Sequence, residues 1–231
     1  LKIMEEYMSS VYDLTTLNYD HVMASILKHF PYRKNGIDIY EFKCKVFLAV
    51  NWIINKRTCY FTEQFLKNQV NLLTDDRDKR ISKFLQIAEE TGIITVVNNR
   101  IFKDQSRFFT KSSIHTIRIE NPVLVMANEV EPVCEAEAGI KQIAQYTYDE
   151  AKLSVKSRLI EKIEVDFAND YKTFFIDGES KKKRIGRPIF FKHEKKLPGI
   201  LLIHGYMAAP REMKDFAEYL YQKQFSVYVP R

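Results

Sequence analysis

Cysteine, glycine and proline are scarce, at three, seven and seven residues among 231. The cysteines (Cys44, Cys59 and Cys134) are odd in number and widely spaced, so neither a disulfide framework nor a zinc knuckle fits them. A reducing cytoplasm is the expected compartment. The few glycines and prolines exclude collagen-like and low-complexity sequence. Hydrophobic residues make up 45% of the chain, which predicts an ordinary soluble globular protein.

Long hydrophobic runs are also missing. The most apolar window, residues 46–54, is interrupted by Asn51 and is too short to cross a bilayer. The opening residues, LKIMEE, lack the basic and apolar regions of a secretory leader. They also lack an initiator methionine, from which we expect a chain cut from a longer protein.

Positive charge is concentrated in one segment. Basic side chains dominate residues 181–196, whereas the whole chain has a net charge of only +6. A solvated linker is the first interpretation of this segment. The second is contact with an anionic membrane surface through Lys181, Lys182, Lys183 and Arg184, because acidic headgroups attract clustered basic residues. The protein would then be peripheral at the inner membrane face.

The N-terminal half carries helical patterns. Apolar residues recur at helical spacing in four segments, residues 4–30, 37–54, 62–73 and 75–90. Pro31 is expected to end the first helix, Thr62 to cap the third and Gly92 to stop the fourth.

A β-hairpin is predicted next. Ile93–Val97 is β-branched, Asn98 and Asn99 tolerate positive φ, and Arg100–Phe102 resumes an extended pattern. Two helices followed by a hairpin resemble a winged helix, which makes a DNA-binding regulator one alternative function. The helix at 75–90 mixes acidic and basic side chains, so it would release few counterions from a phosphate backbone. This argues against nucleic acid as a partner.

The middle of the chain predicts a strand and then helix. Residues 114–126 alternate and are β-branched, as in a strand. Residues 136–175 have apolar positions at helical spacing, in one helix or two. Thr147 and Glu150 would form a capping box if a helix restarts there.

The C-terminal residues predict a β-α-β unit. The apolar run Gly199–Ile203 is typical of a buried parallel strand. A helical pattern follows over residues 211–222, and a second strand over residues 225–230. Ile189–Phe191 is expected to be an early antiparallel strand of the same sheet.

Residues 186–231 resemble the N-terminal part of the α/β-hydrolase family, in its monoacylglycerol-lipase-like and carboxylesterase-like branch. The matching residues are Leu201–Tyr206, Glu212, Met213, Leu220 and Tyr228–Arg231. In that family, the backbone N–H after the His-Gly pair forms half of the oxyanion hole.

The resemblance therefore implies that the Tyr206 N–H stabilises the negative oxygen of a tetrahedral intermediate. His204, Gly205 and Met207 would complete the oxyanion loop, with His204 too early in the chain to be the catalytic base. One departure is Gln224, where the family usually has a helix-ending glycine.

The catalytic machinery of that family is missing from these residues. No Gly-x-Ser-x-Gly nucleophile elbow is present, and the family's serine, acid and histidine follow later than Arg231. We therefore expect no catalytic residue, metal site or cofactor in this chain, and the intact protein would supply the triad.

Residues 1–178 resemble the C-terminal part of bacterial glycerol-3-phosphate and lysophospholipid acyltransferase-like proteins, the region after their catalytic core. The segments that carry this resemblance are Asn18–Leu27, Gly36-Ile37, Ile119–Pro122 and Ala127–Pro132. That family uses His-x-x-x-x-Asp, in which the carboxylate orients a histidine base. Only His115 with Glu120 approaches the pattern, and on a strand the two would lie on opposite faces.

Together these observations predict an α+β helical domain with a winged-helix-like β-hairpin, followed by the first strands and helix of an α/β-hydrolase, whose parallel sheet is incomplete. The expected boundaries are residues 1–178, a basic linker and early strand at 179–198, and residues 199–231. The expected function is a serine-type acyl-ester hydrolase fused to a glycerolipid acyltransferase-like module, with an acyl-lipid substrate. The alternatives are a winged-helix nucleic-acid-binding regulator and a non-catalytic membrane-docking module.

Overall fold

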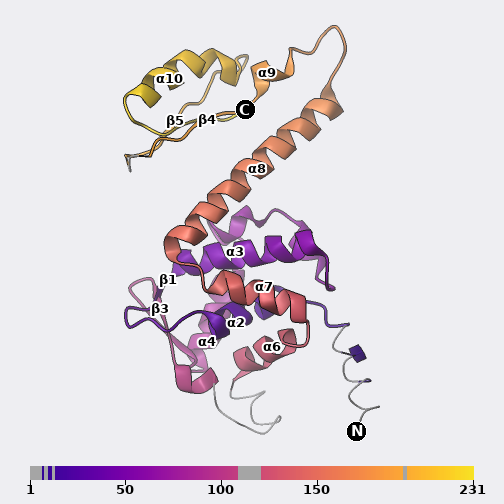
Figure 1. Cartoon of the computed structure of the whole chain (residues 1–231), viewed down its shortest axis with the longest axis vertical. Coiled ribbons are helices and arrows are strands. Elements are labelled where there is room, and N and C mark those ends of the chain that lie inside the picture. Colours follow the sequence, from indigo (N-terminus) through magenta and orange to yellow (C-terminus); the bar gives the residue numbers. More distant parts are fainter. Residues whose placement is uncertain (1–6, 8–9, 12–13, 109–120, 195–196) are drawn as a thin grey trace. The chain divides into compact units, whose positions relative to one another are not determined.

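A computed structural model describes residues 7, 10–11, 14–108, 121–194 and 197–231. The chain forms two compact units, Leu1–Val155 and Lys156–Arg231, called here the N-terminal and C-terminal units (Figure 1). Their boundary falls inside one long helix, α8 (Tyr148–Phe174), whereas the sequence placed the end of the first domain at residue 178. Each unit has a hydrophobic core of its own.

Helix α2 (Tyr19–His29) is the centre of the N-terminal unit. Eight of its eleven residues are buried, and it contacts α3 (Ile39–Lys56), α4 (Arg80–Glu90), α6 (Pro122–Val130) and α7 (Cys134–Ala144). The prediction of one helix over residues 4–30 is wrong, because residues 14–18 are not helical. Leu17 instead forms a parallel β-bridge with Phe61, and the Asn18 side chain caps α2 by accepting from the His21 N–H.

A three-stranded antiparallel sheet lies beside these helices. Its strands are β1 (Ile37–Asp38), β2 (Ile94–Val97) and β3 (Arg100–Lys103), in the order β1-β3-β2. The predicted hairpin is confirmed, with Asn98 and Asn99 at φ 49° and 62°. Helix α3 begins two residues later than predicted because residues 37–38 pair with β3.

The helix predicted over residues 62–73 is replaced by two 3₁₀ turns, η1 (Glu63–Leu66) and η2 (Gln69–Leu72). The cause is the buried side chain of Gln69. Its amide nitrogen donates to the carbonyls of Gln64, Phe65 and Lys67 at 3.2, 2.6 and 2.8 Å. Carbonyls held this way no longer need the i+4 amides of an α-helix. Thr62, the predicted cap, makes no capping hydrogen bond.

Helix α4 begins at Arg80, five residues after the predicted start. The Asp76 carboxylate accepts from the N–H groups of Ile81 and Ser82, at 3.2 and 2.8 Å, and so satisfies the free amides of the first turn. Gly92 follows the end of the helix at φ 67°, where the prediction placed the stop.

The strand predicted over residues 114–126 is wrong where the structure describes it, because residues 122–126 belong to α6. Asn121 accepts from the Leu124 N–H at 2.9 Å, and Pro122 occupies the first turn, where its missing N–H costs nothing. Residues 114–120, including His115 and Glu120, lie outside the described residues.

The helical pattern of residues 136–175 resolves into two helices, α7 and α8. The predicted capping box separates them. The Thr147 N–H donates to Glu150 at 2.7 Å, and the Glu150 N–H donates to the Thr147 hydroxyl at 3.3 Å. Across the described part of the chain, no helix has the length and apolar character that crossing a membrane requires.

The C-terminal unit contains a second small sheet, β4 (Ile189–Phe191), β5 (Ile200–Leu201) and β6 (Val227–Val229), in the order β4-β6-β5. Strand β5 runs parallel to β6, and the chain between them forms η4 (Pro210–Met213) and α10 (Lys214–Gln222). The predicted β-α-β unit is therefore confirmed. So is the antiparallel strand at residues 189–191, which pairs with β6.

One packing contact in the N-terminal unit tests the fold directly. A Cβ added at Gly139 of α7 would lie 2.7 Å from ring atoms of Trp52 on α3. Helix propensity alone would make Gly139→Ala stabilising by about 1 kcal/mol. We expect the opposite sign, a loss of about 1–3 kcal/mol in the free energy of unfolding, because the added methyl overpacks the contact.

Urea unfolding followed by Trp52 fluorescence measures this effect. Lys141→Ala, at an exposed position of the same helix, is the matched control and should leave stability nearly unchanged. A Gly139→Ala variant more stable than the parent would contradict the close packing of α7 on α3.

Candidate functional site

The loop singled out by the sequence, residues 204–207, follows β5 after Leu202 and Ile203. The Ala208 N–H donates to the Gly205 carbonyl at 3.0 Å and closes a turn with Tyr206 and Met207 at its centre. Ligands of parallel α/β sheets bind beyond the carboxyl ends of the strands. The turn therefore lies at the end of β5 where a ligand is expected.

The Tyr206 amide is the group to which the resemblance assigns a role. Among the described residues, its N–H has no hydrogen-bond partner. The Tyr206 side chain is completely exposed, at 101%, and Met207 is 85% exposed. An N–H fixed at the centre of a turn and unpaired is available to a negatively charged oxygen.

His204 and Gly205, the two residues before Tyr206, have different roles in the loop. His204 Nδ1 lies 3.1 Å from the Gly205 carbonyl, a contact that requires a proton on Nδ1 because a carbonyl only accepts. No carboxylate or hydroxyl within the described ranges contacts this ring, although a catalytic base needs such partners. A Cβ at Gly205 would meet nothing within 4 Å, so the backbone stays open to close approach from outside.

Two histidine–glutamate pairs, which the sequence analysis missed, join α2 to its neighbours. His21 Nε2 lies 3.0 Å from Glu129 of α6, and His29 Nε2 lies 2.6 Å from Glu137 of α7. Because His21 Nδ1 accepts from the Asn18 N–H, the proton is on Nε2, which donates to Glu129. Both ring nitrogens of His21 are thus hydrogen-bonded. This arrangement suits a residue that holds two helices together better than a general base.

Lys103 forms another polar centre, at the C-terminal end of α2. Its ammonium donates to the carbonyls of Leu27, Lys28 and Phe30 at 3.2, 3.0 and 2.7 Å. These carbonyls have no partner within the helix, so Lys103 satisfies the end of a buried element. Burial lowers the pKa of Lys103 to about 8.

Lys45 is fully buried on α3 and binds the end of α7. Its Nζ donates to the Ala144 carbonyl at 2.8 Å and lies 3.0 Å from Glu41, which also binds Arg33 at 2.9 Å. Burial lowers the pKa of Lys45, while the adjacent carboxylate opposes that shift. Lys45 and Glu41 are both buried, so this cluster ties α3 to α7 inside the core, where a substrate does not reach.

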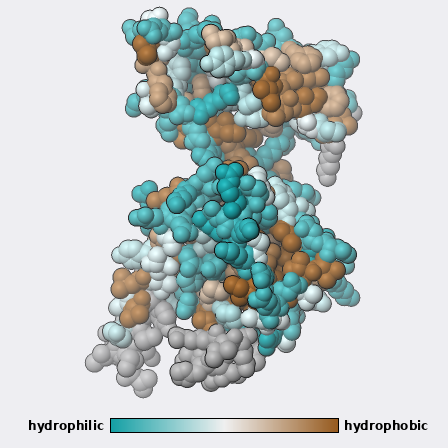
Figure 2. Space-filling view, turned by 180° about the vertical axis from the view of Figure 1, so that it is seen from behind, coloured by the Kyte–Doolittle hydropathy of each residue, from teal (hydrophilic) through white to brown (hydrophobic). Residues whose placement is uncertain are grey.

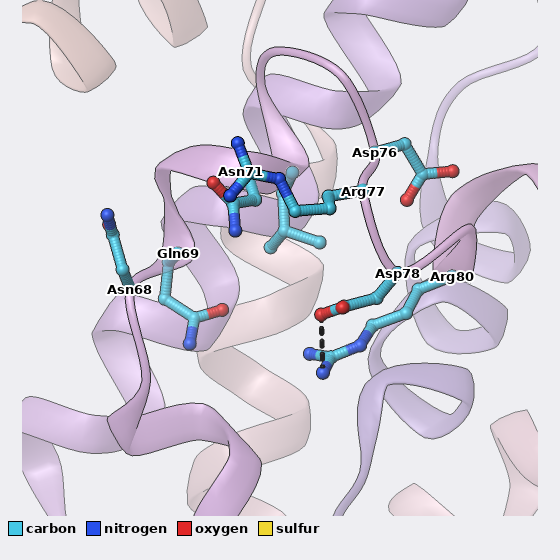
Figure 3. Close-up of a pocket in the computed structure, with 8 residues that line it drawn as sticks. Asn68, Gln69, Asn71, Asp76, Arg77, Asp78 and Arg80 are labelled. Carbon is cyan, nitrogen blue, oxygen red and sulfur yellow. Dashed lines mark ion pairs between the residues drawn. The ribbon is translucent and has the colours of Figure 1, made fainter.

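A small pocket lies between η2 and the start of α4, lined mainly by polar side chains (Figure 3). Arg80 pairs with Asp78 at 2.8 Å and stacks over the Tyr19 ring, and Arg77 pairs with Asp75 at 3.3 Å. Each arginine already has a carboxylate partner. The pocket is therefore poorly suited to phosphate, which would have to displace those pairs.

The cysteines differ in their exposure to solvent. Cys44 is buried, which raises the pKa of its thiol to about 11, whereas Cys59 is half-buried against the core and Cys134 is exposed. Within the ranges that the structure describes, no three His, Cys, Asp or Glu side chains are grouped to hold a metal ion.

Comparisons with known proteins add no family to this geometry. No protein-family model, curated protein or solved structure matches the chain. The loop after β5 and the surfaces of the C-terminal unit are therefore the features that bear on function.

The His29–Glu137 pair predicts a pH dependence of stability. Burial lowers the pKa of His29, and Glu137 offsets this only in part. The unfolded chain then binds more protons than the folded chain as the pH falls through about 6.5. We expect the free energy of unfolding to decrease from about pH 7 to about pH 5, and more steeply in the parent than in His29→Gln.

Denaturant unfolding at several pH values, followed by Trp52 fluorescence in the same unit, measures the two slopes. Glutamine keeps an amide donor near Glu137 and removes the titrating group. Parallel pH curves for the two proteins would show that His29 does not contribute.

Proposed function

We propose that the C-terminal unit is the opening part of a serine-type acyl-ester hydrolase, in which the Tyr206 amide is one of the oxyanion donors. The observation that carries the proposal is the unpaired Tyr206 N–H in a turn at the carboxyl end of a parallel strand. When a nucleophile attacks an ester, the carbonyl oxygen becomes negative. A donor fixed in advance stabilises that charge without reorganising.

The topology of the small sheet supports this proposal. An antiparallel strand precedes a parallel β-α-β unit, as the resemblance implies. Gln224, which stands where that family usually has glycine, has φ 73°. Glycine is the residue that adopts this left-handed conformation without cost, so the backbone matches the family's preference although the side chain differs.

A sheet face that is covered only in part also supports a larger α/β sheet in the intact protein. The Lys156 ammonium of α8 lies 4.8 Å from the Phe190 ring centroid, whereas Leu201 is exposed. Val227, Val229 and Ile200 face α10. The register places Phe190, Tyr228 and Leu201 in one row on the opposite face. Leu201 is 57% and Ile203 73% exposed, and Figure 2 shows hydrophobic surface on the C-terminal unit. Parallel sheets bury both faces, so further strands and a helix would be needed to cover this row.

In this proposal, the remaining catalytic groups would come from other residues. A serine would attack the ester carbonyl while a histidine base takes its hydroxyl proton, and an acidic residue would orient that histidine. The histidine then returns the proton to the leaving alcohol, and water releases the acyl group. The chain's own contribution is the Tyr206 donor and the open backbone at Gly205.

The N-terminal unit enters the proposal as an accessory module of lipid metabolism, on its sequence resemblance to acyltransferase-associated regions. Its His21 and His29 are engaged with glutamates, so acyl transfer would require a base elsewhere. Nothing favours DNA binding by α4. The exposed face of α4 carries Lys83 together with Glu89 and Glu90. This mixture of charges would be attracted only weakly to the phosphates of DNA.

The test uses the product of the complete reading frame. A fluorophosphonate probe should label one serine in it, and the protein should hydrolyse a monoacyl ester. Tyr206→Pro removes the N–H and should lower turnover by about 10²-fold or more. Tyr206→Phe keeps the amide of this fully exposed residue and should retain turnover.

Circular dichroism of both variants separates loss of the donor from loss of the fold. A reading frame that stops at Arg231, or a product that no fluorophosphonate labels, would rule out the hydrolase. Equal turnover in Tyr206→Pro and the parent would remove the oxyanion assignment alone.

A further inference from the structure

The C-terminal end of α8 carries exposed apolar side chains. Phe174 is 74%, Ile176 55% and Phe175 46% exposed. A turn follows, and then the four basic residues 181–184, all of them exposed. We call residues 172–184 the α8–α9 tip, after the short helix α9 (Lys183–Gly186) in which the basic run ends.

Hydrogen bonds hold the two parts of this tip together. The Ser180 N–H donates to the Ile176 carbonyl at 2.9 Å, and the Ile176 N–H donates to the Ser180 hydroxyl at 2.8 Å. The Tyr171 hydroxyl donates to the Lys181 carbonyl at 3.0 Å, and Gly178 takes φ 79° in the turn. The basic segment is therefore folded against α8, although the sequence first suggested a solvated linker.

An aromatic row on α8 supports the basic segment. The ring centroids of Phe167 and Tyr171 lie 6.2 Å apart, and those of Tyr171 and Phe175 lie 5.4 Å apart. The Lys183 ammonium lies 6.0 Å from the Phe167 centroid, at the limit of a cation–π contact. The row thus engages Phe175 and Lys183, whereas Phe174 and Ile176 have no aromatic partner among the described residues.

The charge of the tip is positive and uncompensated. Asp177 and Glu179 are its acidic residues, set against Lys172 and the basic residues 181–184. Within the described part of the chain, none of Lys172, Lys181, Lys182 and Arg184 forms an ion pair.

We propose that the α8–α9 tip docks on an anionic lipid bilayer, with Phe174 and Ile176 entering the interface and Lys181, Lys182 and Arg184 contacting headgroups. Exposed apolar side chains beside clustered basic ones are the combination that binds acidic membranes. A nucleic-acid backbone would bind the basic side chains, but it has no apolar surface to contact the exposed Ile176. The surface is independent of the hydrolase proposal, although it would bring an esterase to acyl lipids.

Vesicle flotation tests whether the basic residues of the tip contribute to membrane binding. Vesicles of phosphatidylcholine alone are compared with vesicles in which about a third of the lipid is phosphatidylglycerol. We expect binding to the anionic vesicles only, weakened by salt. The double variant Lys181→Gln/Lys182→Gln should bind about 10-fold more weakly or worse. Lys34→Gln/Lys67→Gln removes the same charge from exposed positions of the N-terminal unit and should bind like the parent.

A second pair of variants tests the apolar part. Phe174→Ser/Ile176→Ser should lose most binding, whereas Leu66→Ser/Leu153→Ser, which changes two exposed leucines outside the tip, should retain it. In Phe174→Trp, brominated acyl chains should quench the new fluorescence. The half-buried Trp52 of the parent provides the unquenched baseline.

Three results overturn the proposal. The first is equal binding to neutral and anionic vesicles, and the second is equal loss of binding in the tip variants and their controls. The third is binding of single-stranded RNA without binding of vesicles, which would assign the tip to nucleic acid. Flotation measures binding and not turnover, so a protein that does not bind vesicles would leave the hydrolase proposal unaffected. Absence of esterase activity would likewise leave the membrane-docking proposal unaffected. Circular dichroism confirms that each variant is folded.

Discussion

The burial of α2 is the constraint on which the N-terminal unit depends. A helix surrounded by four others cannot leave its terminal amides and carbonyls to water, so side chains must satisfy them. Asn18 does so at the start of the helix and Lys103 at its end. Lys103 comes from β3, so the same contact joins the small sheet to α2. His21 and His29 then tie α2 to α6 and α7 through glutamates.

Elements specified by local chemistry were predictable from the sequence. Asn98 and Asn99 identify the hairpin because few other residues tolerate two successive positive φ angles. Thr147 and Glu150 identify the start of α8 because they bond reciprocally. The β-α-β unit follows from an apolar run, a helical pattern and a second strand. The loop at residues 204–207 was singled out only by the resemblance of its His-Gly pair to a known family, and its role as an oxyanion donor stays a prediction.

Elements decided by a single side chain or by distant contacts were not predictable. The Gln69 amide breaks a helical pattern, and Asn121 with Pro122 turns an apparent strand into a helix. The His21–Glu129 pair spans 108 positions, which no periodicity reveals. Likewise, composition identified the basic segment, but only the structure places it against Phe167 and Tyr171 of α8.

The close contact of Gly139 with Trp52 has a consequence for sequence variation. The two positions lie on different helices, and neither can change size alone without opening or overfilling the space between them. Relatives that keep this N-terminal unit should therefore pair a smaller side chain at position 52 with alanine or serine at position 139, and keep glycine wherever position 52 is large. Such coupled substitution in an alignment of relatives would mark the contact between α3 and α7.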